Sequence, residues 1–153
     1  MPGFGGFPRD ALTFFADLEA NNDRSWWAAN KDRFETSVRE PMRQLLDQLA
    51  PAYGEFHVFR PQRDTRFSKD KSPYKTQHAA ASETDAGGAT YYLHLSQAGL
   101  FTGAGLYHPA SDQLERYRAA VDDDATGRAL EQAVAAVRRR RVEVSAGEGS
   151  LSN

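Results

Sequence analysis

The side chains best suited to chemistry lie in one segment, residues 60–76, which we call the basic loop. It holds six cationic residues but only two acidic ones, although the whole chain carries a net charge of −2. Arginine can hold a phosphate or carboxylate group through two hydrogen bonds, and lysine adds a point charge. The composition therefore predicts a site for a small anionic ligand. The cationic residues are Arg60, Arg63, Arg66, Lys69, Lys71 and Lys75.

The two acids of the basic loop, Asp64 and Asp70, are expected to orient its cations. Because they lie beside so much positive charge, their carboxyl groups should have a lowered pKa and stay ionised. Arg63 and Arg66 would then hold the anion, and Tyr74 would close one side of the site. The full set predicted to bind the anion is Arg60, Arg63, Arg66, Lys71, Tyr74 and Lys75.

Two other functions fit the same residues. In the first, both acids pair with arginines, and the basic loop is a structural network that binds no ligand. In the second, the loop binds nucleic acid together with the arginine run at 138–141, and salt between about 50 and 200 mM would weaken such binding steeply. If the site catalyses a reaction, electrostatic stabilisation in phosphoryl or carboxylate-ester chemistry is the natural class. The residues of the run are Arg138, Arg139, Arg140 and Arg141.

Composition narrows the class of protein further. The length of 153 residues is that of one domain, and the absence of cysteine excludes disulfides and thiolate metal sites. The four scattered histidines lack the spacing of a metal centre. No apolar run approaches the ~20 residues of a membrane span. We therefore expect a single-domain, cytoplasmic protein with no metal site and no membrane partner, and the residues indicate no particular cofactor, catalytic group or oligomeric state.

The first predicted element is a helix over residues 9–20, where apolar side chains recur at helical spacing. Asn21, Asn22 and Asp23 should end it, because their short polar side chains suit helix caps and turns. Either Asn22 or Asp23 is then expected to cap a short turn. That turn would carry Trp26 and Trp27 into the core rather than expose them as a stacking platform.

A second apolar stripe runs through residues 34–49 and keeps its phase across Pro41. A proline inside a helix removes one backbone hydrogen bond. The stripe therefore predicts a kinked or broken helix with one buried face, and Pro51 is expected to close it.

Beyond Gly54 the pattern becomes extended. Residues 90–96 alternate apolar and polar side chains, as a half-buried strand does, and a turn at 97–99 would return the chain as an antiparallel partner. The predicted fold class is α+β, in which an N-terminal helical layer packs on a small, mainly antiparallel sheet and further helices follow. The expected strands are 56–60, 79–82, 90–96, 100–107 and 141–145, with a turn-rich gap at 83–88, and the later helices start near residues 109 and 126.

The spacing within the basic loop also resembles the signature of a known family. The pattern reads Arg60-x-x-Arg63-Asp64-x-Arg66-Phe67-x-x-Asp70-Lys71-x-x-Tyr74. It is similar to that of a widespread family of bacterial proteins, also found in fungi, that is classed as a domain of unknown function. The resemblance extends over nearly the whole chain and includes the elements around Asn21, Trp27 and Tyr91.

This resemblance implies no activity, because none is established for the family. A family identified by charged residues in one loop is more simply explained by a shared site than by shared packing, which favours the anion site over the structural alternative. Members usually continue beyond the position of Asn153. The resemblance therefore implies a chain that is C-terminally incomplete or shortened.

Overall fold

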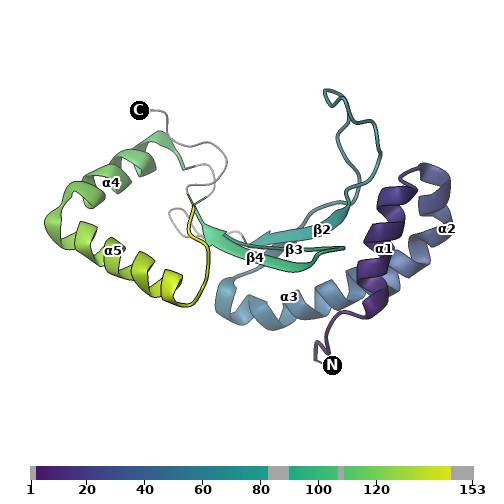
Figure 1. Ribbon diagram of the computed structural model, residues 1–153, viewed down its shortest axis with the longest axis horizontal. Coiled ribbons are helices and arrows are strands. Elements are labelled where there is room, and N and C mark those ends of the chain that lie inside the picture. Colours follow the sequence, from purple (N-terminus) through teal and green to yellow (C-terminus); the bar gives the residue numbers. More distant parts are fainter. Residues whose placement is uncertain (1–2, 83–89, 107–108, 146–153) are drawn as a thin grey trace. The chain divides into compact units, whose positions relative to one another are not determined.

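The computed structural model describes residues 3–82, 90–106 and 109–145. The chain forms two compact units, Met1–Tyr107 and His108–Asn153. Among the described residues of the first unit, three α-helices and one π-helical turn precede a four-stranded antiparallel sheet, and those of the second unit form two more helices. Figure 1 shows this order of elements. The predicted α+β class is confirmed.

Helix α1 (Arg9–Ala20) has the predicted bounds and buries its apolar stripe, including Phe14 and Leu18. Asp23 caps the next helix, α2 (Arg24–Phe34), because its carboxylate accepts hydrogen bonds from the backbone N–H groups of Ser25 and Trp26 at 2.8 and 2.9 Å. The expected short turn is therefore a helix of 11 residues. The cap determines where Trp27 enters the core.

Arg33 on α2 joins the first two helices. It donates to Asp10 of α1 at 2.9 Å and to Asp17 of α1 at 2.8 Å. Its guanidinium also lies 5.6 Å from the centre of the Phe14 ring. These contacts hold α2 against α1, which positions the aromatic side chains that α2 carries.

The helical path does not break at Pro41. A turn of π-helix, η1 (Glu35–Arg39), leads directly into α3 (Glu40–Tyr53), with Pro41 in the first turn of α3. A proline there removes one backbone hydrogen bond of the continuous path, and it closely follows the wider π-helical turn. The prediction that Pro51 closes the helix is wrong. The helix continues to Tyr53 and ends at Gly54, whose φ of 82° favours glycine.

The sheet is an antiparallel meander with the order β1-β2-β3-β4. His78 pairs with Leu95, and Ala80 pairs with Leu93, so these four buried side chains share one face of the sheet. The alternation predicted for residues 90–96 is confirmed, while the predicted gap at 83–88 lies outside the described residues. The strands are β1 (Phe56–Val58), β2 (Gln77–Ser82), β3 (Thr90–Ser96) and β4 (Gly99–Gly105).

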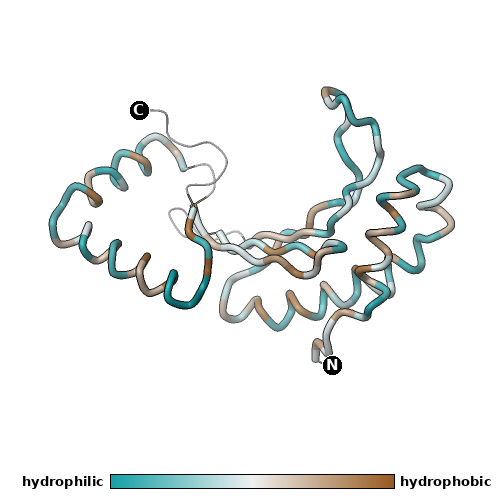
Figure 2. Tube along the Cα trace, in the orientation of Figure 1, coloured by the Kyte–Doolittle hydropathy of each residue, from teal (hydrophilic) through white to brown (hydrophobic). Residues whose placement is uncertain are grey.

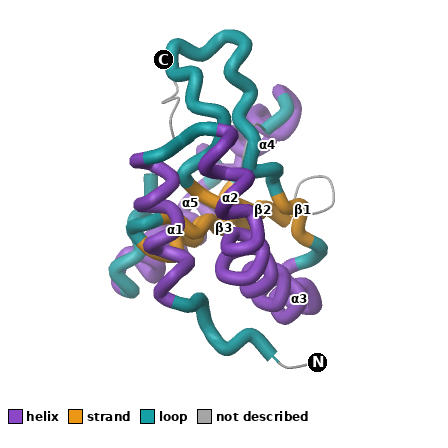
Figure 3. The backbone as a smooth tube through the Cα atoms, turned by 90° about the vertical axis from the view of Figure 1, so that its right-hand side faces the viewer, coloured by secondary structure: helices purple, strands orange, loops and turns teal. Residues whose placement is uncertain are grey.

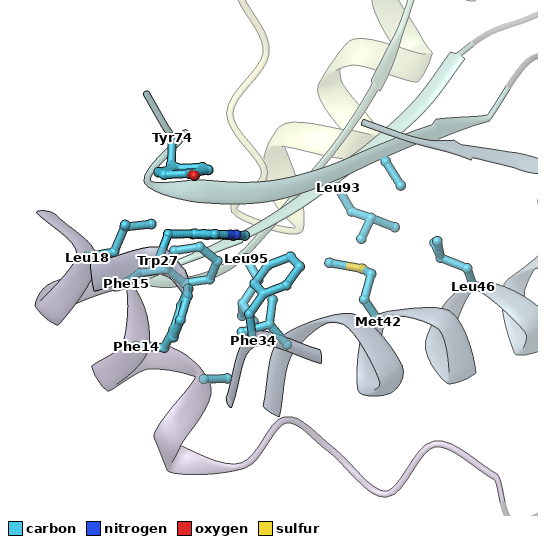
Figure 4. Packing of buried hydrophobic residues seen from close by; sticks show 13 residues of the cluster. Phe14, Phe15, Leu18, Trp27, Phe34, Met42, Leu46, Tyr74, Leu93 and Leu95 are labelled. Carbon is cyan, nitrogen blue, oxygen red and sulfur yellow. The ribbon is translucent and has the colours of Figure 1, made fainter. Parts of the chain in front are cut away.

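The core of the first unit lies between this face of the sheet and the helices, with α3 running along the sheet and α1 crossing near one end of it (Figure 1). Its centre is an aromatic cluster in which Phe14 lies 5.6 Å from Phe34 and 6.0 Å from Trp27. The core prediction for Trp27 is confirmed, and Trp26 is partly buried against the same cluster. Figure 4 shows how Phe14, Trp27 and Phe34 pack.

The second unit contains α4 (Ser111–Asp122) and α5 (Asp124–Arg139). Asp123 separates them and caps α5 by accepting from the N–H groups of Ala125 and Thr126 at 3.0 Å each. The strand predicted at 141–145 is wrong, since these residues form no regular strand. In the parts of the chain that the structure describes, no helix combines the length and apolarity needed to cross a membrane.

Candidate functional site

The basic loop leaves the sheet between β1 and β2 and is closed at its base. Gln62 and Tyr74 form an antiparallel bridge. On either side, the N–H of Arg63 donates to the carbonyl of Pro73 and the N–H of Lys75 donates to the carbonyl of Pro61, both at 2.8 Å. The loop then projects beyond the helices and strands (Figure 3), and its course is mostly hydrophilic (Figure 2).

Two contacts anchor the base of the loop to the helices. The ring of Tyr74 is 9% exposed and stacks on Trp27 with 4.2 Å between centroids and 10° between planes (Figure 4). The side chain of Asn22 donates to the carbonyl of Tyr74 at 2.8 Å and accepts from its N–H at 3.0 Å. The structure therefore places Tyr74 in the core, where Trp27 covers one face of its ring.

We expect Asn22→Ala to lower the free energy of unfolding by about 1–3 kcal/mol, because it leaves the N–H and carbonyl of Tyr74 without partners in a partly buried place. Urea denaturation measures this loss. Asn21→Ala is the matched control, since it removes only one exposed hydrogen bond, to the carbonyl of Asp17. Equal stability of the two variants would mean that Asn22 does not anchor the loop.

The acids of the loop each contact one arginine. Asp70 pairs with Arg63, which also donates to the hydroxyl of Ser72 at 2.6 Å. Asp64 accepts from Arg66 at 2.7 Å. These hydrogen bonds are the largest cause of the lowered pKa of each carboxyl group. The pairs agree with acids that orient arginines for a ligand, and they agree equally with a structural network.

The lysines of the loop bond to backbone instead. Lys71 Nζ donates to the carbonyl of Thr65 at 2.8 Å, and Lys75 Nζ donates to the carbonyl of Arg60 at 2.9 Å. Burial lowers the pKa of Lys75, and the charge of Arg60 lowers it further. Within the described residues, neither Arg60 nor Lys75 forms an ion pair with a carboxylate. The charge of Arg60 thus acts on Lys75 and also on the carboxyl group of Asp64, whose pKa it helps to lower.

Four of the predicted site residues meet in one pocket of about 530 Å³ at the base of the loop. Arg63 and Lys75 supply positive charge there, and Asn22 and Gln77 supply amide groups. Arg66 and Lys71 do not line it, and Arg60 lines a different cleft. The complete lining is Glu19, Asn22, Arg63, Asp70, Ser72, Tyr74, Lys75, Thr76 and Gln77.

Sequence reasoning missed that second cleft, which has a volume of about 1130 Å³ and lies between the helices and the β1 segment. Its buried histidine, His78, falls in the part of β2 that precedes the predicted strand at 79–82. If the predicted strand is extended to Gln77, His78 lies on the same face as Ala80. This spacing is the one signal in the sequence that His78 is buried. The rest of the lining comes from positions 27–43 and 58–62.

The other candidate residues belong to the second unit. Arg138 and Arg139 end α5 in the second unit, followed by Arg140 and Arg141, whereas the basic loop belongs to the first. Across the described ranges, no three His, Cys, Asp or Glu side chains gather in a way that could hold a metal ion.

Comparison with known proteins identifies the family. No curated protein and no solved structure matches the chain. A family described as conserved hypothetical protein (DUF2461) matches residues 10–152, which include the basic loop, and this confirms the resemblance to a family of unknown function. The chain therefore belongs to the DUF2461 family of conserved hypothetical proteins.

Proposed function

We propose that the basic loop binds a small molecule bearing a phosphate or a carboxylate group. The observation that carries this proposal is Lys75, a half-buried cation that bonds to the carbonyl of Arg60, feels the charge of Arg60 and forms no ion pair with a carboxylate among the described residues. Repulsion between like charges costs free energy, and an anion bound beside them would relieve it. This cost is easier to explain at a binding site than in a purely structural loop.

The neighbouring pocket supplies the remaining recognition groups. Arg63 is held by Asp70 and Ser72, so its guanidinium is already oriented before a ligand arrives. Preorganised donors bind an anion at a smaller entropic cost than free side chains do. In this proposal Lys75 supplies charge in the pocket, and Arg63 supplies directed hydrogen bonds. Arg60, Arg66 and Lys71, which do not line the pocket, would add to the positive potential.

An ion-paired structural loop is the second candidate, and the two arginine–aspartate pairs favour it. The candidates differ in what the unpaired cations do. A structural loop should gain stability when one of two repelling cations is removed, and nothing should bind there. A binding site should gain the same stability but lose its ligand.

The test is thermal denaturation of the whole chain with inorganic phosphate, phenyl phosphate or succinate, each compared with sodium chloride at equal ionic strength. We expect at least one anion to raise the Tm of the parent beyond the chloride control. Lys75→Gln should weaken that anion about tenfold, because a charge-assisted hydrogen bond contributes about 1.5–3 kcal/mol. Arg63→Gln should weaken it similarly.

Lys69→Gln is the matched control, because Lys69 is an exposed cation of the same loop that lies outside the pocket. It should bind the anion as the parent does. If all three variants lose the anion equally, the effect comes from net charge alone and the proposed site is wrong. If no anion stabilises the parent, the structural loop is the better account.

A further inference from the structure

The second cleft has the composition of a ligand site. Aromatic and aliphatic side chains line it on both sides, with Phe34 and Met42 from the helices and Val58 and Phe59 from the segment that follows α3. Small-molecule sites are typically concave and mainly apolar, with a few placed polar groups. A volume of about 1130 Å³ is sufficient for a molecule with a ring.

The unusual polar group in this cleft is His78. Its side chain is buried to all but 3%, and neither ring nitrogen has a hydrogen-bonding partner among the described residues. Burial also lowers the pKa of His78 to about 4, so the imidazole is neutral at pH 7. A neutral imidazole has one donor and one acceptor, and leaving both without partners away from water is costly. Native proteins rarely keep such a group unless it has a use.

The surroundings of His78 cannot satisfy it. Its ring packs edge-on against Phe34, with 5.2 Å between centroids, which offers no hydrogen bond to the ring nitrogens. The backbone of β2 pairs with β3 at His78, opposite Leu95, and with β1 from Ala80 to Ser82. The contacts of the described residues thus leave both ring nitrogens without a partner, and the cleft is the opening on which His78 lies.

The charges around the cleft favour an anion. Arg39 pairs with Glu35 at 3.0 Å, and Arg43 pairs with Glu40 at 2.7 Å, so these four charges balance. Two further lining cations, Lys31 and Arg60, form no ion pair in the described parts of the chain, which leaves the cleft with positive charge in excess.

The backbone beside the cleft is also irregular in a way that suits a site. The π-helical turn η1 contributes Glu35, Thr36 and Arg39 to the lining. Single π turns inside α-helices occur frequently at functional sites, because the wider turn displaces side chains from the regular helical positions. Here the turn lies between the helical segments that supply Phe34 and Met42.

We infer that this cleft binds a ring-bearing organic anion, with its ring against the exposed side chains of Val58 and Phe59, a hydroxyl or amide group hydrogen-bonded to His78, and its charge beside Arg60. The anionic character of the ligand rests on the proposed function, since Arg60 belongs both to the basic loop and to the lining of this cleft. The contact with His78 does not depend on it. Nothing in the family description or in the sequence pattern assigns a role to this residue.

The experiment uses three matched probes on the whole chain at pH 7.5. The first, 4-hydroxybenzoate, has the ring, the charge and a hydroxyl group; 4-hydroxybenzyl alcohol lacks the charge, and acetate lacks the ring. NMR of the histidine ring nitrogens follows binding, and His78→Phe assigns the signal of His78. We expect 4-hydroxybenzoate to shift that signal in a saturable manner and acetate to leave it unchanged.

Two variants separate the contributions. His78→Phe keeps the ring against Phe34 but removes both nitrogens, so it should weaken 4-hydroxybenzoate about tenfold, the equivalent of one hydrogen bond. It should fold at least as stably as the parent, because an unsatisfied polar group is lost. Arg60→Gln should weaken 4-hydroxybenzoate but leave the weaker binding of the neutral alcohol unchanged.

The outcomes distinguish this inference from the anion site. If the His78 signal does not move with 4-hydroxybenzoate, or if His78→Phe binds the probe as the parent does, the inference about the cleft is wrong even where phosphate stabilises the basic loop. If the acid and the neutral alcohol bind equally and shift His78, the cleft is a ligand site, but Arg60 does not recognise an anion there. A marked loss of stability in His78→Phe would show that His78 has a structural role and would overturn the inference.

Discussion

Replacing Trp27 with alanine is expected to lower the free energy of unfolding by about 3–5 kcal/mol, the usual cost of removing a large buried aromatic side chain. Trp27 is 8% exposed and lies 4.9 Å from Phe34 and 4.2 Å from Tyr74. Its loss would leave a cavity in the aromatic cluster and uncover one face of Tyr74. Because Tyr74 anchors the base of the basic loop, the loop should also become more mobile relative to the sheet.

Two measurements test this expectation. Urea denaturation reports the global loss of stability, and limited digestion with trypsin reports the freedom of the loop, whose arginines and lysines are cleavage sites. Phe67→Ala is the matched control, because Phe67 is a ring in the same loop that is 96% exposed. A substitution at such a position usually changes stability by less than about 0.5 kcal/mol. A Trp27→Ala variant as stable as the Phe67→Ala variant would contradict the packing described here.

The stability of the parent should fall by about 3 kcal/mol as the pH is lowered from about 6.5 to 4, owing to His78 alone. Burial lowers the pKa of folded His78 to about 4, whereas an unfolded histidine titrates near 6.5. Between these values the unfolded chain binds a proton that the folded chain does not. Lowering the pH through this window therefore favours unfolding, and the full stability is present above pH 6.5.

His78→Phe isolates this effect, because it removes the titrating group and leaves the carboxylates of the chain in place. The free energies of unfolding of parent and variant, measured in urea at several pH values, should differ least above pH 6.5 and progressively more towards pH 4. Other charged groups near His78 modify the window: Arg39 and Lys75 lower its pKa further, and Glu35 raises it. Parallel pH profiles for the two proteins would show that His78 titrates normally and is not buried as described.

Much of the fold followed from local pattern. The bounds of α1 and β3 were predicted correctly, because each has a period that only one kind of secondary structure can bury on a single face. The stop after Ala20 followed from the polar side chains of Asn21 and Asp23, which cap or end helices. Pro51 led to a wrong helix end, because a proline often follows the end of a helix. Here it lies inside the last turn of α3, which continues to Tyr53 and is capped by Gly54.

For the candidate site, the sequence by itself determined which charges are present and that prolines forbid a regular helix through the basic loop. The pairing of Asp64 with Arg66 can also be predicted from the sequence, since the two residues are two positions apart in the chain. Such local features depend on residue types and spacing alone.

Only the tertiary structure decided which of these residues are available to a ligand. It buries Tyr74 against Trp27 and bonds it to Asn22, which is 52 residues away. It also brings the side chain of Lys75 to the carbonyl of Arg60. It buries His78 against Phe34, where neither ring nitrogen has a hydrogen-bonding partner among the described residues. Burial and charge proximity are properties of chain segments that meet only after folding. A pattern read along the sequence contains no information about which segments those are.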